Sequence, residues 1–235
     1  MYSDLIVVGH GKMAKVIIEN LPAVAQRDHK LNIATTAWDK RSEESIDYDG
    51  CAVIHVGSGR QLEEVIRYCE QHGLPLIQGA TGVDEELLPD KPSFILIDAP
   101  NLSIPIVKLF ALLDHGKMFF RDFDIRIVES HQSTKTSLAG TARTMANLLG
   151  APAESVVAVR DQTIQRVLLG VPESALGGHA IHRIEIEGLG ATISISTKVF
   201  GRETYLHGII RVLSRIDNLS AGSYLVTDLV NKGLI

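Results

Sequence analysis

A glycine-rich turn between an apolar run and a helical pattern constrains the fold of this 235-residue chain most strongly. Leu5–Val8 is wholly apolar, which is typical of a parallel strand buried on both faces. The sequence Gly-His-Gly-Lys-Met-Ala follows at residues 9–14, and residues 12–20 then place apolar side chains at helical spacing. A strand, a tight turn and a helix are therefore expected within the first twenty residues.

Each small residue of this turn has a separate physical role. Gly9 permits the tight turn, Gly11 lets the backbone approach a pyrophosphate, and Ala14 lets the helix pack close to the strand. The helix N-terminus offers free N–H groups and the positive end of its dipole to phosphates. G-x-G-x-x-A between a strand and a helix thus predicts a dinucleotide-binding turn.

The first hundred residues alternate between strand-like and helix-like segments. Short apolar runs recur, and a helical pattern at residues 61–72 ends at Gly73. This alternation predicts a parallel sheet with right-handed crossovers. The expected strands are residues 5–8, 31–36, 52–56, 74–78 and 94–98.

Small residues follow three of these strands, at the edge where a doubly wound sheet binds its ligands. Gly57-Ser58-Gly59 follows the third strand, Gly79-Ala80-Thr81-Gly82 the fourth and Ala99-Pro100-Asn101 the fifth. Small side chains leave room for a nicotinamide ring and expose backbone hydrogen-bonding groups. Their recurrence at three successive strand ends favours cofactor-binding turns.

The residues after the second strand bear on the choice of cofactor. An acidic residue at the strand tip favours NADH, because it binds the ribose 2′-hydroxyl. Asp39 lies a few residues beyond the tip, whereas Lys40, Arg41 and Lys12 offer cations to a 2′-phosphate. We therefore expect NADPH or NADH, with the cations favouring NADPH.

The pattern changes after Asn101. The expected elements are a helix at 104–120, a strand at 124–129, a helix at 142–149, strands at 181–187 and 191–199, and a helix at 205–216. Gly188-Leu189-Gly190 separates two strands of period two, which is a hairpin signature. The fold class is thus α/β: a Rossmann-type dinucleotide-binding domain and an α+β domain with a mixed, largely antiparallel sheet.

Residues 129–142 contain the densest group of reactive side chains. His131 titrates near neutrality and can give or take a proton. Lys135 is a cation suited to a carboxylate or to developing negative charge. Gly140-Thr141 opens a predicted helix, which makes an anion site. Beside a dinucleotide fold, this group predicts a site for a small anionic substrate that is protonated as it is reduced.

The remaining histidines and cysteines carry less information. His179 and His182 flank the start of a predicted strand and are expected at the surface or an interface, although either could reach a substrate. Cys51 and Cys69 are too few for a disulfide framework and are expected as buried packing residues.

Composition excludes several classes of protein. The net charge is −5 and there is no run of Lys or Arg, so we expect neither nucleic acid nor membrane as a partner. No stretch of 18 apolar residues, signal-peptide pattern or zinc-ligand spacing is present in the sequence. We therefore expect a cytoplasmic protein with reduced thiols and no metal.

Taken together, these motifs resemble the dihydrodipicolinate reductase family over nearly the whole chain. Residues 129–142 are similar to its signature E-x-H-H-x-x-K-x-D-A-P-S-G-T-A, which is the most specific match. The other matches are the turn ending in Lys12-Met13, the segments 73–82 and 99–103, and the tail at 224–229.

The resemblance implies reduction of 4-hydroxy-tetrahydrodipicolinate to tetrahydrodipicolinate in lysine and diaminopimelate biosynthesis. It implies a dinucleotide-binding domain of residues 1–103 with 203–235 and a substrate-binding and oligomerisation domain of residues 104–202 that forms homotetramers. It also implies that His131 donates a proton, that Lys135 is its cationic partner, and that Gln132, Gly140 and Thr141 bind a cyclic dicarboxylate imine. The cofactor residues are Gly9, Gly11, Lys12, Met13, Gly57, Gly79, Thr81, Ala99 and Asn101.

This chain departs from the family pattern in the substrate loop. The His-His pair is His131-Gln132, and the run before Gly140 is one residue shorter and lacks its Asp, Pro and Ser. Two alternatives thus stay open: a reductase of another cyclic imine or an amino-acid dehydrogenase, and a non-catalytic nucleotide-binding regulatory protein.

Overall fold

The structure is a computed structural model that describes residues 2–41 and 48–235. The chain divides into two compact units. The first unit is Met1–Val107 with Glu203–Ile235, and the second is Lys108–Arg202. The cofactor role predicted for the first unit and the substrate role predicted for the second are taken up below as proposals.

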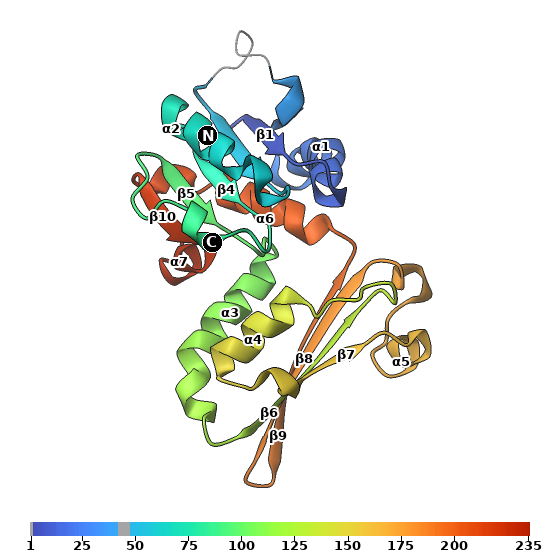
Figure 1. Ribbon diagram of the computed structural model, residues 1–235. Coiled ribbons are helices and arrows are strands. Elements are labelled where there is room, and N and C mark those ends of the chain that lie inside the picture. Colours follow the sequence, from blue (N-terminus) through green and yellow to red (C-terminus); the bar gives the residue numbers. More distant parts are fainter. Residues whose placement is uncertain (1, 42–47) are drawn as a thin grey trace. The chain divides into compact units, whose positions relative to one another are not determined.

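In the described residues, the first unit contains one six-stranded sheet, all of whose neighbouring strands are parallel (Figure 1). The strand order is β10-β5-β4-β3-β1-β2. The strands are β1 (Asp4–Val8), β2 (Ala34–Ala37), β3 (Cys51–His55), β4 (Leu76–Gln78), β5 (Ile95–Asp98) and β10 (Gly222–Leu225). Because β2 lies on one side of β1 and β3 on the other, the strand order reverses between β1 and β3, which is the point where doubly wound sheets bind ligands.

Helices cover both faces of this sheet. Alternate residues of β1 point to opposite faces: Leu5 packs with the core that includes α1 and α6, and Ile6 with the core that includes α2. The predicted burial of this strand on both faces is therefore confirmed. The helices of the unit are α1 (Lys12–Val24), α2 (Leu62–His72), α6 (Glu203–Leu213) and α7 (Val226–Asn231). Cys51 and Cys69 are buried thiols, as expected.

The second strand begins three residues later than predicted. The first helix does not stop near residue 20, because it continues through α1 into a π-helical segment, Ala25–His29. Lys30 then ends the helix in the left-handed conformation with φ 58°. The chain enters β2 only at Ala34.

The second unit is built on a mixed sheet with the order β7-β6-β8-β9 in the described residues. β6 pairs parallel with β7 and antiparallel with β8, and β8 and β9 form the predicted hairpin. The strands are β6 (Asp124–His131), β7 (Val156–Val159), β8 (His179–Gly188) and β9 (Ala191–Phe200). The helices are α4 (Gly140–Leu149), which packs against β6 and β7, and the short α5 (Gln162–Val167).

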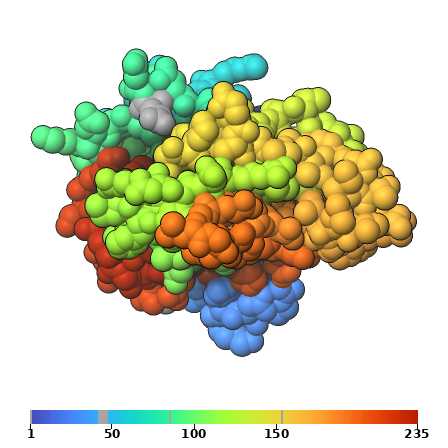
Figure 2. All heavy atoms as spheres, turned by 90° about the horizontal axis from the view of Figure 1, so that it is seen from below, coloured from blue at the N-terminus to red at the C-terminus, as the bar shows by residue number. Residues whose placement is uncertain are grey.

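Helix α3 (Ile104–Gly116) carries the chain from the first unit into the second. The helix predicted over 104–120 is α3 followed by a 3-10 turn, Lys117–Phe120. Beyond this turn, the ring of Phe123 packs on Gly188, where an added Cβ would lie 2.4 Å from that ring. The hairpin (orange) and the segment before β6 (yellow-green) accordingly lie side by side (Figure 2). Within the described residues, no helix is long and apolar enough to span a membrane.

Candidate active site

The glycine turn lies where the strand order reverses, and it touches a second predicted turn. Gly9 has φ +132°, a conformation that disfavours any residue with a Cβ. An added Cβ on Gly9 would lie 2.9 Å from the backbone of Gly57. The two turns thus meet main chain to main chain. Gly11 precedes α1 without a side-chain cap, which leaves the first N–H groups of that helix to a ligand.

The other predicted turns lie along the same edge of the sheet. The Gly79 N–H donates to the His55 carbonyl oxygen at 2.8 Å, and the Ala99 N–H donates to the Gln78 carbonyl oxygen at 2.8 Å. The segments that follow β3, β4 and β5 are therefore neighbours, and Thr81 is exposed on the second of them. The Asn101 side chain accepts a hydrogen bond from the Ser103 N–H at 2.9 Å, which fixes the start of α3.

The charged residues after β2 have different surroundings. The Asp39 carboxylate lies 3.3 Å from the His10 ring nitrogen, beside the glycine turn, and both side chains are exposed. Arg41 instead stacks its guanidinium 3.4 Å from the centre of the Trp38 ring and donates to the Trp38 carbonyl oxygen at 2.7 Å. Arg41 is therefore engaged within the protein, whereas Lys12 and Lys40 are exposed.

In the second unit, a buried carboxylate holds the predicted proton donor. Glu129 and His131 are two residues apart on β6, so their side chains share one face. Glu129 is fully buried, and its Oε2 accepts a hydrogen bond from His131 Nδ1 at 2.7 Å. Because Nδ1 donates to Glu129, Nε2 is the ring nitrogen of His131 that Glu129 does not engage.

Arg160, just after β7, completes this group. Its Nη2 donates to Glu129 Oε1 at 2.5 Å, and its Nη1 donates to Oε2 at 3.1 Å. Burial alone raises the pKa of the Glu129 carboxyl, but the hydrogen bonds from His131 and Arg160 outweigh burial and lower that pKa to about 2. Glu129 is thus an ionised, doubly paired carboxylate at neutral pH.

Arg160 also holds the loop that contains Lys135. Its Nε donates to the Lys135 carbonyl oxygen at 2.8 Å, and its Nη2 donates to the Ser137 carbonyl oxygen at 3.3 Å. The Lys135 ammonium in turn donates to Ser137 Oγ at 3.2 Å. One guanidinium therefore connects the buried Glu129 to the loop that leads into α4. The sequence analysis missed this role of Arg160, because 31 residues separate it from Glu129.

The remaining predicted substrate residues lie at the two ends of this loop. Gln132 follows β6, and its carbonyl oxygen accepts from the Lys135 N–H at 2.9 Å. Gly140 is the first residue of α4, which has no side-chain N-cap, and Thr141 follows it. The buried Gln165 donates to the His131 carbonyl oxygen at 2.7 Å. The loop is thus anchored at both ends, close to a helix N-terminus.

The expectation that His179 and His182 lie at the surface or an interface is wrong within this chain, because both are buried. Each rests on a hydrogen bond inside the sheet: His179 with Ser130 Oγ at 2.9 Å, and His182 with Thr197 Oγ1 at 3.2 Å. The His182 ring packs edge to face with His131 at 5.7 Å between centroids. Burial and the neighbouring His131 lower the pKa of His182 to about 4, so His182 is neutral at physiological pH.

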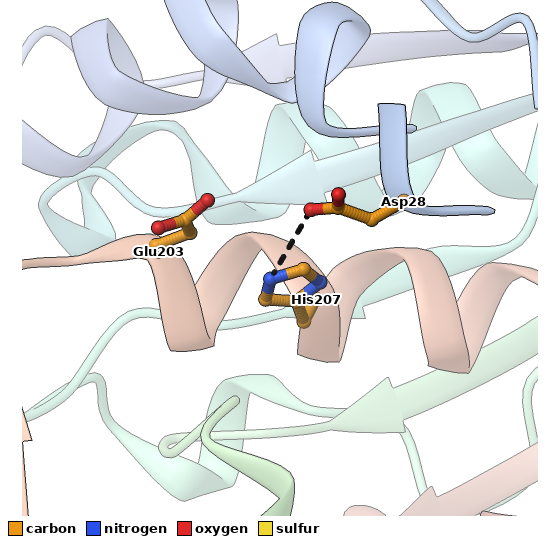
Figure 3. A group of neighbouring side chains, drawn as sticks. All are labelled: Asp28, Glu203 and His207. Atoms are coloured by element: carbon orange, nitrogen blue, oxygen red, sulfur yellow. Dashed lines mark ion pairs between the residues drawn. The ribbon is translucent and has the colours of Figure 1, made fainter. Parts of the chain in front are cut away.

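A group of possible metal ligands lies elsewhere in the first unit. Donor atoms of Asp28, Glu203 and His207 lie within 4.8 Å of one another (Figure 3). Arg27 forms ion pairs with both carboxylates, so a protein cation already offsets part of their charge. His207 also hydrogen-bonds His29 at 2.9 Å. These contacts form an ion-pair network that joins the π-helical segment after α1 to α6.

The fold and the site define a class: a two-unit protein with a Rossmann-type sheet and a second unit that presents a paired histidine beside an anchored polar loop. The model of "Dihydrodipicolinate reductase, C-terminus" matches residues 106–230, which is more than half of the chain. The chain therefore belongs to the dihydrodipicolinate reductase family.

Individual relatives agree with this family. A probable 4-hydroxy-tetrahydrodipicolinate reductase 1 of Oryza sativa is 31% identical over 157 residues, which cover 61% of this chain and 46% of that protein. The 4-hydroxy-tetrahydrodipicolinate reductase of Streptomyces griseus is 26% identical over 234 residues, covering 91% and 93%. The chain thus aligns with less than half of the rice protein but with most of the bacterial one.

Solved structures show the same fold. Dipicolinate-bound dihydrodipicolinate reductase from Paenisporosarcina sp. TG-14 superposes with a TM-score of 0.69 at 15% identity, covering 97% of this chain and 100% of that one. The diaminopimelate (DAP) dehydrogenase of C. glutamicum has a TM-score of 0.54 at 8% identity, with coverage of 100% and 96%. At such identities the likeness concerns the fold alone.

Proposed function

We propose that this chain reduces 4-hydroxy-tetrahydrodipicolinate to tetrahydrodipicolinate with a nicotinamide cofactor, in lysine and diaminopimelate biosynthesis. The observation that carries the proposal is the hydrogen bond between buried Glu129 and His131, at the position of the signature histidine. Family membership supplies the substrate class, and the glycine turn supports the cofactor. When bound, the cofactor would supply a hydride to the conjugated double bond that forms once the substrate has lost its 4-hydroxyl group as water.

In this mechanism His131 delivers the proton that follows the hydride. Glu129 accepts the Nδ1 hydrogen at 2.7 Å, which orients the ring and leaves Nε2 toward the substrate. The same carboxylate stabilises the imidazolium from which the proton leaves. Arg160 holds Glu129 from the other side, so the carboxylate cannot turn away from His131.

The anchored loop binds the carboxylates of the substrate. Lys135 supplies the positive charge, and Gly140 and Thr141 supply N–H groups at the start of α4. Gln132 takes the place of the second signature histidine and offers an amide in place of an imidazole. Because an amide does not exchange a proton in this way, only His131 of this pair can act as a proton donor.

Side-chain contacts in the first unit support NADH as the preferred cofactor. Asp39 lies beside the glycine turn, where an acidic residue binds the ribose 2′-hydroxyl and repels a 2′-phosphate. Arg41, which the sequence offered to a 2′-phosphate, is stacked on Trp38 instead. We therefore assign the preference to NADH over NADPH, although the sequence alone favoured NADPH.

The proposal includes a cytoplasmic homotetramer that assembles through the sheet of the second unit. Alternate β9 residues are exposed in the described chain, and Phe200 and Val157 leave apolar surface on this sheet, 44% and 38% exposed. Size-exclusion chromatography with light scattering measures the mass of the assembly. We expect four times the chain mass, and a stable monomer would contradict the proposed tetramer.

Absorbance at 340 nm tests the reaction itself. Pyruvate, aspartate semialdehyde and the preceding synthase generate the substrate in the cuvette, and NADH is supplied. We expect consumption of NADH, and a fall of turnover by about 10²–10⁴-fold in His131→Gln, because a positioned proton donor contributes that much. His115→Gln is the matched control, since His115 hydrogen-bonds only its own helix at Ala111 among its described contacts.

The same assay separates the alternatives. If the protein binds NADH but does not oxidise it with any of the imines tested, the result favours the non-catalytic regulatory protein. If NADH is consumed only with other cyclic imines, the protein is a reductase of a different substrate. The altered loop at Gln132 makes this the second candidate function. Equal turnover in His131→Gln and wild type overturns the assignment of the proton donor.

A further inference from the structure

Two polar side chains lie fully buried at the ligand-binding edge of the first sheet, outside every role assigned so far. His55 and Gln78 each expose 0% of their surface. They are the last residues of the adjacent strands β3 and β4 and are paired directly in the parallel register. Burial of polar groups is unfavourable unless they form hydrogen bonds. Their contacts therefore indicate what they hold in place.

Gln78 connects His55 to the turn that follows β4. The Gln78 Nε2 donates to the Ala80 carbonyl oxygen at 3.0 Å, and the Gln78 Oε1 lies 3.4 Å from the Ala80 N–H. This arrangement fixes the orientation of the amide, so Oε1 also accepts the hydrogen bond from His55 Nδ1 at 2.6 Å. A single amide thus binds both main-chain groups of Ala80 and the imidazole.

His55 extends this chain of contacts to the turn that follows β3. Its Nε2 lies 3.3 Å from the Ser58 carbonyl oxygen. A Cβ added to Gly57 would lie 3.4 Å from the same nitrogen, so the ring lies directly against this turn. Gly57 in turn touches Gly9, where an added Cβ would come within 2.9 Å. The contacts reach from Ala80 through His55 to the glycine turn.

We propose that His55 and Gln78 are positioning residues that fix the turns at 57–59 and 79–82 in the conformation that binds the dinucleotide. This inference rests on the proposed cofactor binding and deepens it. The ligand meets main-chain groups of these turns, and the pair orders them before the ligand arrives. Order that already exists in the free protein does not have to be created on binding, which raises affinity.

Equilibrium titration of the full chain with NADH, monitored by the fluorescence of NADH, tests the positioning role of His55 and Gln78 independently of turnover. Gln78→Met keeps the shape and removes every hydrogen bond of the amide. We expect the Kd for NADH to rise about tenfold, equivalent to the loss of one or two net hydrogen bonds. Gln78→Glu keeps the acceptor for His55 but loses the donor to the Ala80 carbonyl oxygen, so we expect its Kd to lie between those of wild type and Gln78→Met.

Ile77→Val is the matched control, because it changes the neighbouring residue of the same strand. Ile77 is fully buried and packs in the core that includes α1 and α6. This variant weakens the packing of β4 and leaves the polar pair intact, so we expect an unchanged Kd. Hydrogen exchange gives a second measurement: amides of residues 79–82 should exchange faster in Gln78→Met than in Ile77→Val.

The outcomes distinguish failure of the positioning role from failure of the proposed function. If the wild type does not bind NADH, the cofactor proposal itself fails. If the wild type binds NADH, and Gln78→Met and Ile77→Val bind it equally well with equal exchange, the positioning role is overturned. Should Gln78→Met not fold, His55→Asn and His55→Leu replace it: the amide of Asn retains a donor for Gln78, so only His55→Leu should weaken binding.

Discussion

Both sheets end in buried polar side chains, but the parallel sheet of the first unit pairs a histidine with an amide and the mixed sheet of the second pairs a carboxylate with a guanidinium and a histidine. His55 and Gln78 hold main-chain turns together. Glu129 and Arg160 hold the ring of His131 and the carbonyl groups of a loop. In the proposed function, the first pair orders backbone that meets the cofactor, whereas the second group orients a side chain that carries a proton.

The difference is energetic as well as chemical. A buried ion pair gains little stability, because desolvation offsets the attraction between its charges. A neutral hydrogen-bonded pair carries a smaller desolvation penalty. The proposed reaction would account for the buried charges of the second unit.

Arg160→Met should have the largest effect, because it leaves Glu129 buried with only His131 as a partner. We expect turnover to fall about 100-fold and the free energy of unfolding to fall by about 3 kcal/mol. Urea unfolding and the assay at 340 nm measure the two quantities. The double variant Glu129→Gln with Arg160→Met should regain most of the stability and none of the activity. Recovery of both would show that the charges serve the fold alone.

Acid should destabilise the protein through Glu129. The pKa of this carboxyl lies near 2 in the folded protein, below its ordinary value of 4.5. A lowered pKa contributes stability above pH 4.5 that is lost as the pH falls toward 2, and here it amounts to about 3 kcal/mol. Unfolding in urea at pH 7, 4.5 and 3 measures how the free energy of unfolding depends on pH. Glu129→Gln should reduce this dependence.

Gly208→Ala should destabilise the first unit by close contact rather than by charge. A Cβ at Gly208 on α6 would lie 1.6 Å from the Leu102 carbonyl oxygen. We expect a loss of about 2 kcal/mol, typical of overpacking. Gly116→Ala is the control, because its Cβ would meet nothing closer than 3.9 Å and alanine favours a helix. In thermal unfolding, we therefore expect Gly208→Ala to lower the melting temperature and Gly116→Ala to raise it.

Asp39→Ala should change the choice of cofactor and leave the stability unaltered. Removal of the acidic group lets a 2′-phosphate approach, so we expect the ratio of KM values for NADPH and NADH to fall about tenfold. Lys40→Ala is the companion variant: if Lys40 binds the 2′-phosphate, its loss raises the KM for NADPH alone. A ratio that does not move in Asp39→Ala contradicts the assignment of NADH.

Local patterns were sufficient to predict the glycine turn, the parallel strands near it and the position of His131, because each is encoded within a few neighbouring residues. The short β7, α5 and β10 escaped prediction: β7 is half exposed and lacks a clear period, and β10 has only four residues. Glu129 meets His131 within one strand, but the contact between Gln78 and His55 is set by the pairing of β3 with β4. A sequence read along the chain contains no signal for the contact between Arg160 and Glu129.

The position of β10 has a consequence for synthesis on the ribosome. This strand pairs with β5 at the edge of the parallel sheet, although about 120 residues separate the two along the chain. Translation proceeds from the N-terminus, so the whole second unit emerges before the strand that completes the first. The nascent chain must therefore keep the β5 edge unpaired until residues 222–225 have been made.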